Sequence, residues 1–319
     1  MRKILITGGA GFIGSSLAEK LIEDDENYVV IVDDLSTGNP LKLQKKASSN
    51  WKLIKCDVNN YEDISSVMLS YQFNYVFHYA ALVGVDRTQE NPVKVLDDIK
   101  GFENLLNLSK NTGVKRVFFS SSSEIYGESV EMPQHEEKTP LNSRLPYAIV
   151  KNVGEAFLRS YKQEYNLDYT IFRFFNTYGP KQSRDFVISK FIFKAMKNEA
   201  ITIYGDGKQT RTFCFIDDNV DACLNAFYED KIVNDVVNIG GDIEVPIIDL
   251  ANLIIKLTKS KSKIVYLPPL EEGDMHRRRP DITKMKKLLN HELLPLEKGI
   301  KKILKAGLFE LKHELIEFY

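Results

Sequence analysis

Cysteine is scarce in this sequence, and the segments that would mark an exported or membrane-spanning chain are missing. The three cysteines, Cys56, Cys214 and Cys223, are odd in number and lack the spacing of metal ligands. We expect reduced thiols in core positions, which favours a cytoplasmic protein without a metal centre. No apolar run reaches the length that crosses a bilayer, and the run 4–6 is too short for a signal peptide.

An excess of charge of either sign is missing as well. The chain has 43 basic and 44 acidic residues, which gives a formal net charge of -1. A protein that binds nucleic acid or an anionic membrane through its overall charge carries a basic excess. The balance therefore excludes nucleic acid and membranes as expected partners and favours a small-molecule substrate.

What the sequence does contain is an alternation of short β-branched runs with longer amphipathic segments. This pattern predicts an α/β fold, a doubly wound parallel sheet with helices on both faces. The predicted strands are 3–7, 28–32, 52–55, 75–79, 116–120 and 169–172. The predicted helices are near 12–23, 61–71, 93–112, 146–165, 218–230, 247–258 and 296–317.

The alternation changes after Gly179–Pro180, where strands become sparser. The sequence therefore predicts two domains. The larger comprises residues 1–178 together with about 212–240. Residues 179–211 and 241–319 form a smaller, mixed α/β lobe.

A glycine-rich turn joins the first predicted strand to the first predicted helix. Gly8, Gly11 and Gly14 allow a tight turn, close approach of a pyrophosphate and close packing of helix on strand. The N-terminus of the helix then faces the phosphates. The second predicted strand ends near Asp33, where an acid grips a ribose 2′-hydroxyl. This spacing predicts a dinucleotide-binding site.

Acidic side chains after the second and third strands distinguish NAD from NADP. Asp33 accepts hydrogen bonds from a free 2′-hydroxyl and repels a 2′-phosphate. Asp34 adds a second negative charge, and no arginine stands beside the pair in the sequence. We therefore predict NAD. Asp57 is placed to meet the adenine, or it is a solvated acid at the end of a strand.

A tyrosine and a lysine lie one helical turn apart in the predicted helix 146–165. Tyr147 and Lys151 share a face of that helix. An ammonium beside a phenol favours the phenolate, so the pair is suited to take a proton from a substrate hydroxyl. The serine run 120–123 follows the fifth strand, at the sheet edge where doubly wound folds bind ligands, and a serine there can hydrogen-bond the reacting oxygen.

Together these residues resemble the extended short-chain dehydrogenases/reductases, and within them the NAD-dependent nucleotide-sugar epimerases and dehydratases. The resemblance covers nearly the whole chain. It rests on the glycine turn, on Ser122 with Tyr147 and Lys151, and on the segments 79–81, 175–180, 204–211 and 217–218. It implies a Rossmann domain that holds NAD tightly and regenerates it in each cycle, and a C-terminal lobe that binds a nucleoside-diphosphate sugar.

The same resemblance implies which residues contact each ligand. NAD would meet the glycine turn with Phe12 and Ile13, the three acids, Ala80, Ala81, Tyr147 and Lys151. The diphosphate would meet Asn176, Arg211 and Arg277 or Arg278, and Tyr204 would lie against the base. At least one arginine of the run 276–279, which begins with His276, is expected to be a solvated surface residue instead.

Enzymes of this kind oxidise the sugar at C4, and the fate of the ketone depends on an acid–base group near C5. Ser123 and Glu124 discriminate between reactions. The resembling 4,6-dehydratases carry aspartate–glutamate there, the glucuronate decarboxylases carry serine–glutamate, and many epimerases carry small or hydroxyl residues, although some carry an acid. The short segment 179–186 looks more like dehydratase and epimerase loops. We expect a 4,6-dehydratase in which Glu124 assists loss of water. The alternatives are a 4-epimerase, a decarboxylase, and an NAD-binding regulator without activity, and Glu124 can instead be a structural acid.

The predicted helices near 93–112 and 147–165 carry more apolar residues than a single stripe that faces the sheet would need. These are Phe102, Leu105, Phe157 and Tyr161. The resemblance implies that the two helices pair with their copies in a homodimer, and ordinary core packing is the alternative.

Overall fold

The computed structural model describes residues 1–43, 49–128, 131–269 and 277–309, with the backbone alone at 85 and 86. The chain divides into two compact units. Unit 1 comprises Met1–Ile125, Ser143–Arg173 and Cys223–Val237, and unit 2 comprises Tyr126–Asn142, Phe174–Ala222 and Asn238–Tyr319. This division assigns 126–142, 174–178, 212–222 and 238–240 to unit 2, whereas the sequence placed them in the larger domain. The predicted boundaries stay a prediction.

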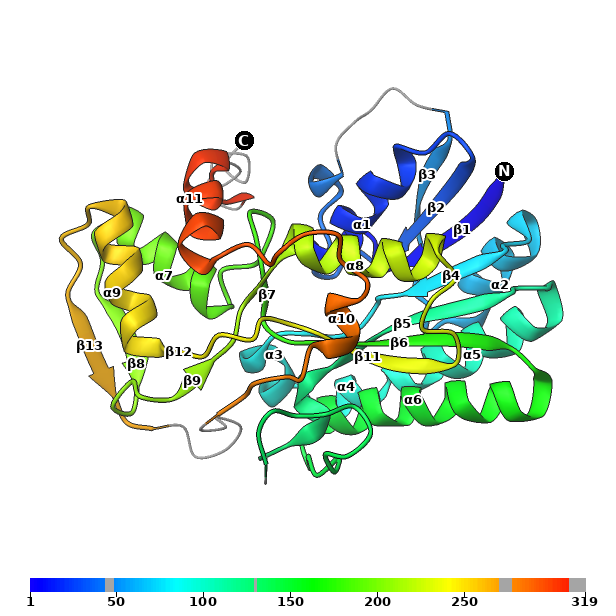
Figure 1. Cartoon of the computed structure of the whole chain (residues 1–319). Coiled ribbons are helices and arrows are strands. Elements are labelled where there is room, and N and C mark those ends of the chain that lie inside the picture. Colours follow the sequence, from blue (N-terminus) through cyan, green and yellow to red (C-terminus); the bar gives the residue numbers. More distant parts are fainter. Residues whose placement is uncertain (44–48, 129–130, 270–276, 310–319) are drawn as a thin grey trace. The chain divides into compact units, whose positions relative to one another are not determined.

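Unit 1 is built on a seven-stranded sheet, which confirms the predicted α/β fold (Figure 1). The strand order is β11-β6-β5-β4-β1-β2-β3, and the pairs β1–β2, β2–β3, β1–β4 and β4–β5 are parallel. The strands are β1 (Arg2–Thr7), β2 (Asn27–Asp33), β3 (Trp51–Lys55), β4 (Tyr75–His78), β5 (Arg116–Ser122), β6 (Asp168–Phe174) and β11 (Asp235–Ile239). The order reverses between β1 and β4, and ligands of such sheets bind at the carboxyl ends beside this reversal.

The helices of unit 1 follow the predicted pattern, apart from an unpredicted helix at Val85–Glu90 and an error over 93–112. They are α1 (Phe12–Ile22), α2 (Tyr61–Tyr71), α3 (Val85–Glu90), α4 (Pro92–Leu96), α5 (Asp98–Thr112), α6 (Pro146–Tyr165) and the end of α8 (Ile216–Tyr228), with short turns η1 (Pro40–Lys42) and η2 (Ser123–Tyr126). The single helix predicted over 93–112 is wrong, because the chain breaks at Asp97. There the backbone N–H of Asp97 bonds Lys94 and that of Lys100 bonds Asp97, a tighter turn than an α-helix makes.

Alternate residues of β5 pack on opposite faces of the sheet. Phe118 stacks between Phe77 and Phe172, at centroid distances of 4.4 and 6.1 Å, on the face that Phe227 of α8 covers. Phe119 faces the other way, toward Phe102 of α5. In Figure 1, α5 and α6 run side by side along this second face. The core therefore holds β5 from both sides up to its serine-rich carboxyl end.

Two apolar residues that suggested a dimer face belong to this core. Phe102 and Leu105 are 3% and 1% exposed within unit 1. Core packing therefore explains them, and only Phe157 and Tyr161 are partly buried. The three cysteines are free and buried, which confirms their predicted core positions.

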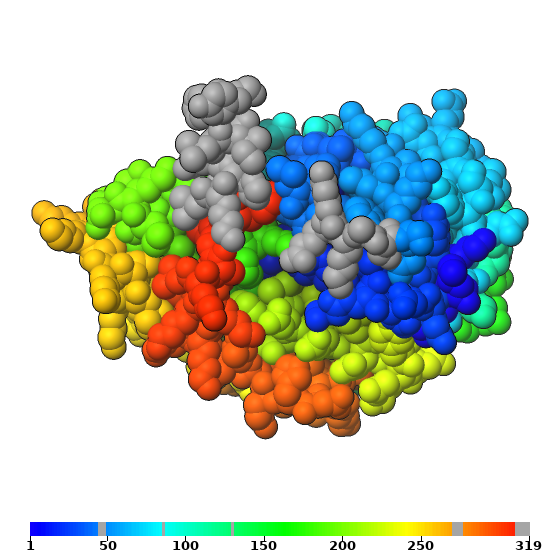
Figure 2. Space-filling view, turned by 90° about the horizontal axis from the view of Figure 1, so that it is seen from above, coloured from blue at the N-terminus to red at the C-terminus, as the bar shows by residue number. Residues whose placement is uncertain are grey.

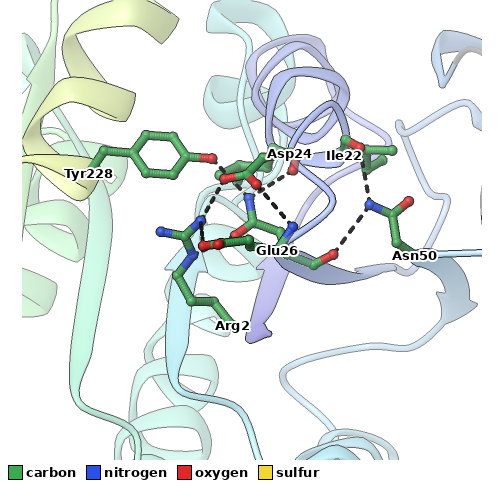
Figure 3. A network of polar contacts seen from close by, with 8 residues as sticks. Arg2, Ile22, Asp24, Glu26, Asn50 and Tyr228 are labelled. Atoms are coloured by element: carbon green, nitrogen blue, oxygen red, sulfur yellow. Dashed lines mark hydrogen bonds and ion pairs between the residues drawn. The ribbon is translucent and has the colours of Figure 1, made fainter.

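The amino ends of the strands in unit 1 carry a polar network (Figure 3). Arg2 donates to Asp24 at 2.6 Å and to the Asn27 side chain at 2.9 Å. The Asn27 amide donates to the Leu21 carbonyl at 2.8 Å and to the Tyr228 hydroxyl at 2.9 Å. One buried asparagine therefore ties β1, the end of α1, β2 and α8 together.

Unit 2 is made of small sheets and helices. Its elements are β7 (Thr177–Tyr178), α7 (Val187–Met196), β8 (Ile201–Tyr204), β9 (Thr210–Arg211), β10 (Cys214–Phe215), the start of α8, β12 (Val245–Pro246), α9 (Ile247–Thr258), β13 (Ile264–Leu267), α10 (Thr283–Lys286) and α11 (Leu296–Ala306). The strands pair as β7–β10, β8–β13 and β9–β12, and α9 packs against α7 and α11.

The last helix is shorter than predicted. A helix over 296–317 is wrong because α11 ends at Ala306, where Gly307 adopts φ +77°. Residues 310–317 of that prediction lie outside the described residues. The space-filling view shows α11, coloured red, at the surface (Figure 2). In the described part of the chain, no helix combines the length and hydropathy needed to span a bilayer.

Candidate functional site

The glycine turn after β1 brings backbone close to backbone. Gly8 adopts φ +65°, and a Cβ there would stand 2.6 Å from the Ala80 nitrogen. A Cβ at Gly14 would stand 2.4 Å from the Gly8 carbonyl oxygen. Gly11 is the N-cap of α1, so Phe12 and Ile13 are its first residues and their N–H groups lie at the helix end that binds anions. Because the glycines have no Cβ, the backbone forms an open cradle here, and this cradle fits a dinucleotide pyrophosphate.

The acid at the end of β2 is held by the same turn. Asp33 accepts hydrogen bonds from the backbone N–H groups of Ala10 and Leu35, both at 2.9 Å. Burial raises the pKa of this carboxyl, and the two N–H groups oppose that rise. A carboxylate has about four acceptor positions, so two remain for ribose hydroxyls.

The two neighbouring acids have local partners. Asp34 accepts hydrogen bonds from the Ser36 N–H and hydroxyl at 3.0 and 2.8 Å. Asp57 accepts one from the Asn59 N–H at 2.9 Å. Both side chains therefore stabilise turns after their strands, and their contacts with NAD stay predictions.

A threonine and a histidine join the carboxyl ends of β1 and β4. Thr7 Oγ1 accepts the N–H groups of Tyr79 and Ala80, each at 3.2 Å, so its own proton is left for His78 Nδ1 at 2.8 Å. The imidazole therefore carries its proton on Nε2. Burial, assisted by the charge of Lys151, lowers the pKa of His78 to about 3. His78 is neutral at every physiological pH, and its partner Thr7 holds the Tyr79 and Ala80 N–H groups at the start of the loop that follows β4.

Lys151 lies between the predicted catalytic tyrosine and β5. Its Nζ is 5.7 Å from the Tyr147 ring centroid and donates to the Ser120 carbonyl oxygen at 2.7 Å. The side chain is 2% exposed. Burial lowers the pKa of Lys151 to about 8, and the charge of Asp98 acts in the opposite direction. The predicted pairing of Tyr147 with Lys151 on one face of α6 therefore exists in the structure.

The serine run ends β5 and begins the short turn η2. Ser122 is the last residue of β5, and its Oγ accepts the Glu124 N–H at 3.2 Å. Ser122 and Ser123 are buried, whereas Glu124 is partly exposed. The hydroxyl and the carboxyl group that were predicted to act on the sugar thus lie two residues apart at the carboxyl end of one strand.

Three further residues are hydrogen-bonded to one another beside the end of β5: Ser121, Glu155 and Arg173. The sequence did not single them out. The Ser121 hydroxyl donates to Glu155 at 2.7 Å, and Arg173 forms a bidentate pair with the same carboxylate. The spacing of Glu155, four residues after Lys151, was the available signal. An acid in that position faces the core together with the lysine.

The residues predicted to bind substrate all belong to unit 2. Asn176 adopts φ +34°, its amide donates to the Thr212 carbonyl at 3.0 Å, and its carbonyl accepts the Cys214 N–H at 3.3 Å. Arg211 lies on β9, opposite Val245 of β12. Tyr204 ends β8 and is partly buried. Asn176 therefore contacts the segment that directly follows Arg211.

The two candidate arginines near 277 differ in their surroundings. Arg277 is exposed and forms a bidentate pair with Glu244, at 3.0 and 2.6 Å. Its hydrogen bonds lower the pKa of Glu244. Arg278 is buried, at 6% exposure. Glu244 also accepts the Thr210 hydroxyl at 2.7 Å, so Arg277 is linked to the residue before Arg211. His276 lies outside the described residues.

Comparison with known proteins gives concordant findings. The family described as NAD dependent epimerase/dehydratase matches residues 4–240. UDP-glucuronic acid decarboxylase 1 of Danio rerio is 34% identical over 98% of this chain and 74% of its own length. A putative UDP-glucose 4-epimerase of Methanocaldococcus jannaschii is 35% identical over 94% and 96%. The structure of a UDP-glucose 4-epimerase of Thermotoga maritima with UDP-glucose is 33% identical, covers 98% and 99%, and has a TM-score of 0.89.

Proposed function

The chain belongs to the NAD-dependent epimerase/dehydratase family, and from this premise we propose that it decarboxylates a UDP-hexuronate after transient oxidation at C4. It is an NAD-dependent enzyme of the nucleotide-sugar epimerases, dehydratases and decarboxylases. The observation that carries the finer assignment is Glu124, a partly exposed carboxyl group two residues beyond Ser122. Epimerisation at C4 needs no acid–base group near C5, whereas decarboxylation does.

The first chemical role belongs to Tyr147. Its phenolate takes the proton of the C4 hydroxyl, Lys151 stabilises that phenolate with its ammonium, and the Ser122 hydroxyl donates a hydrogen bond to the same sugar oxygen. NAD would be held by the glycine turn and Asp33, and it would supply the acceptor and later the donor of the C4 hydride. Because Lys151 is fixed to the Ser120 carbonyl, its charge has one position relative to Tyr147.

The second role belongs to Glu124. With a ketone at C4, a C6 carboxylate is a β-keto acid: the C5–C6 bond breaks, carbon dioxide leaves, and the electron pair passes to C5 and the C4 oxygen. The Glu124 carboxyl then donates a proton to C5. Reduction of the ketone completes the cycle, so a UDP-hexuronate and a proton give a UDP-pentose and carbon dioxide.

Two other reactions begin with the same oxidation at C4. The first is loss of water across C5 and C6, the reaction that the sequence favoured, which also uses Glu124. The similarity to the Danio decarboxylase does not support this dehydration. A 4-epimerase is the second candidate, favoured by the similarity to the Methanocaldococcus and Thermotoga proteins and by the short segment 179–186. We place decarboxylation first because C4 epimerisation has no chemical use for the Glu124 carboxyl group near C5.

The nucleotide would be held by unit 2. Arginine forks suit phosphate oxygens, so we assign the diphosphate to Arg211 with Arg277 or Arg278, and to the Asn176 amide. Tyr204 would lie against the base. Arg277 would then exchange one of its bonds to Glu244 for a phosphate oxygen, because its side chain is 56% exposed and Glu244 keeps the Thr210 hydroxyl.

Product analysis tests the assignment. The protein is incubated with UDP-glucuronate, UDP-glucose and UDP-N-acetylglucosamine, and products are weighed by mass spectrometry. Loss of carbon dioxide from UDP-glucuronate is expected. Loss of water would establish dehydration instead, and an isomer of unchanged mass would establish epimerisation.

Glu124→Gln separates the two roles. The variant should still oxidise C4, seen as absorbance of reduced nicotinamide, but release pentose at least about tenfold more slowly, because the proton donor at C5 is gone. Glu62→Gln, an exposed acid on α2, is the matched control. Equal pentose formation by both variants contradicts the role of Glu124.

The homodimer stays a proposal with its own test. Apolar side chains remain exposed on the outer sides of α4 and α6, and Val93, Ile149 and Tyr165 are 76%, 42% and 44% exposed. Together with the partly buried Phe157 and Tyr161, they would pack on a second copy. Light scattering at micromolar concentration should give twice the mass of the chain, and a monomer mass rejects the proposal.

A further inference from the structure

A carboxylate shielded from solvent lies in the middle of α6. Glu155 is 0% exposed, and it accepts hydrogen bonds from Arg173 Nε and Nη2 at 2.9 and 2.7 Å. The Ser121 hydroxyl donates to Oε1 at 2.7 Å, and Arg159 Nη2 donates to Oε2 at 3.2 Å. These bonds occupy the acceptor positions that a carboxylate offers.

Stability alone does not explain this buried pair. Removing two charges from water costs about as much as their attraction returns, and apolar residues of similar volume often stabilise a fold equally well. An apolar contact between α6 and β5 would, however, leave the register of the helix loosely defined. Hydrogen bonds of fixed length and direction specify one position, and a fully bonded buried network gives rigidity as well.

The position that they specify concerns the predicted catalytic residues. Glu155 follows Lys151 by four residues and Tyr147 by eight, so all three lie on the same side of α6. Ser121 directly precedes Ser122 on β5, and Arg173 lies on β6, the neighbouring strand. Lys151 binds the carbonyl of Ser120. Two consecutive residues of β5 are thus tied to α6 immediately before Ser122.

We propose that Glu155, held by Arg173, is a positioning residue that fixes the Ser122 hydroxyl relative to the Tyr147 phenol through its bond to Ser121. The inference rests on the roles proposed above for Ser122 and Tyr147. Glu155 itself is buried and acts only through Ser121. Proton transfer requires both groups within hydrogen-bond distance of one oxygen, and a displacement of about 1 Å can slow such a step roughly a hundredfold.

The test removes one hydroxyl group. Ser121→Ala keeps the Glu155–Arg173 pair and releases β5 from it. In a single turnover with a UDP-sugar substrate, the nicotinamide should be reduced about tenfold more slowly, while KM and the Kd for NAD change less than about twofold. In the ligand-free protein, amide hydrogens of 118–124 should exchange faster, because the strand end opens more often.

Ser109→Ala is the matched control. Ser109 is also a fully buried serine of unit 1, but its hydroxyl makes no hydrogen bond to the described residues. The proposal is overturned if the two variants show equal reduction rates and equal exchange, or if Ser121→Ala loses NAD affinity in proportion to its rate. A wild-type protein that oxidises no UDP-sugar would refute the proposed function instead, and the exchange data would still decide the role of the bond.

Discussion

Both ends of the sheet in unit 1 carry polar networks, and the two networks differ in their contact with water. At the amino ends of the strands, Arg2 meets Asp24 and Glu26, and the side chains of Arg2 and Asp24 are each 32% exposed. At the carboxyl ends, His78 and Lys151 are at most 3% exposed. The charged groups of the first network share their bonds with solvent, and only its Asn27 is fully buried, whereas His78 and Lys151 of the second depend on protein partners.

This difference shows that charge alone does not identify a functional site. The amino-end network holds the charged groups of Arg2, Asp24 and Glu26, yet its members only connect the turn between α1 and β2 to the start of β1. Buried polar groups must have partners of defined geometry, because an unpaired one costs about 1–3 kcal/mol. Burial therefore gives the carboxyl end its fixed geometry, and the parallel strands make this end the ligand-binding edge. The following experiments separate the two ends by function and by stability.

The largest effect is expected at the carboxyl end, from Tyr147→Phe. The variant lacks the group that we propose takes the C4 proton, so kcat should fall by about 10²–10⁴. The ring remains, so the melting temperature should stay close to that of the wild type. Turnover is followed by mass spectrometry of the product. Unchanged turnover would show that another residue is the base.

A pH profile gives the next largest effect. Burial lowers the pKa of Lys151 to about 8, so kcat/KM should fall roughly tenfold per pH unit above that value, as the ammonium is lost. Stability should change in the opposite direction. The unfolded chain holds the lysine proton to about pH 10, so it binds more protons than the folded chain between about pH 8 and 10, and the free energy of unfolding rises there.

Rate and stability are therefore measured together across this window. Activity that declines while urea resistance increases identifies titration of Lys151. Activity and urea resistance that decline in parallel would point to alkaline unfolding and contradict the assignment. His78 adds no change of slope to the pH profile near neutral pH, because burial lowers its pKa to about 3.

The sequence predicted those parts of the molecule that depend on neighbouring residues. The six predicted strands and the helices predicted at 12–23, 61–71 and 146–165 are confirmed, because alternating apolar patterns and a glycine turn are local signals. The break at Asp97 escaped prediction because the apolar spacing continues through it. The two-residue strands β7, β9, β10 and β12 escaped it as well, since each is defined only by a partner elsewhere in the chain.

The same limit applies to the site. Tyr147 and Lys151 could be paired from their spacing on one helix. The bonds of Ser121 and Arg173 to Glu155 join residues 34 and 18 positions apart, and that of Thr7 to His78 joins residues 71 apart. Such pairs follow from the order of strands in the sheet. A sequence pattern read along the chain does not contain that order.

Asn27→Ala should affect stability without affecting catalysis. Asn27 is 0% exposed, and its side chain bonds Arg2, the Leu21 carbonyl and the Tyr228 hydroxyl. Its loss leaves buried partners unsatisfied, so the free energy of unfolding in urea should fall by about 1–3 kcal/mol. kcat/KM at 25 °C should stay within about twofold. The exposed Asn142→Ala is the control, and a large loss of activity in Asn27→Ala would refute the separation of the two ends.

The smallest effect is expected from Asp24→Asn in the same network. The Arg2–Asp24 ion pair is short, at 2.6 Å, but both side chains are one-third exposed and Glu26 lies 3.3 Å from the same Arg2 nitrogen. Exposed pairs contribute about 0–1 kcal/mol, and Glu26 can replace the lost partner. The free energy of unfolding should therefore fall by less than about 1 kcal/mol, and the loss should shrink further at about 1 M salt, where charges are screened within about 3 Å. A loss equal to that of Asn27→Ala, independent of salt, would mean that the exposed charges and not the buried amide hold the amino end together.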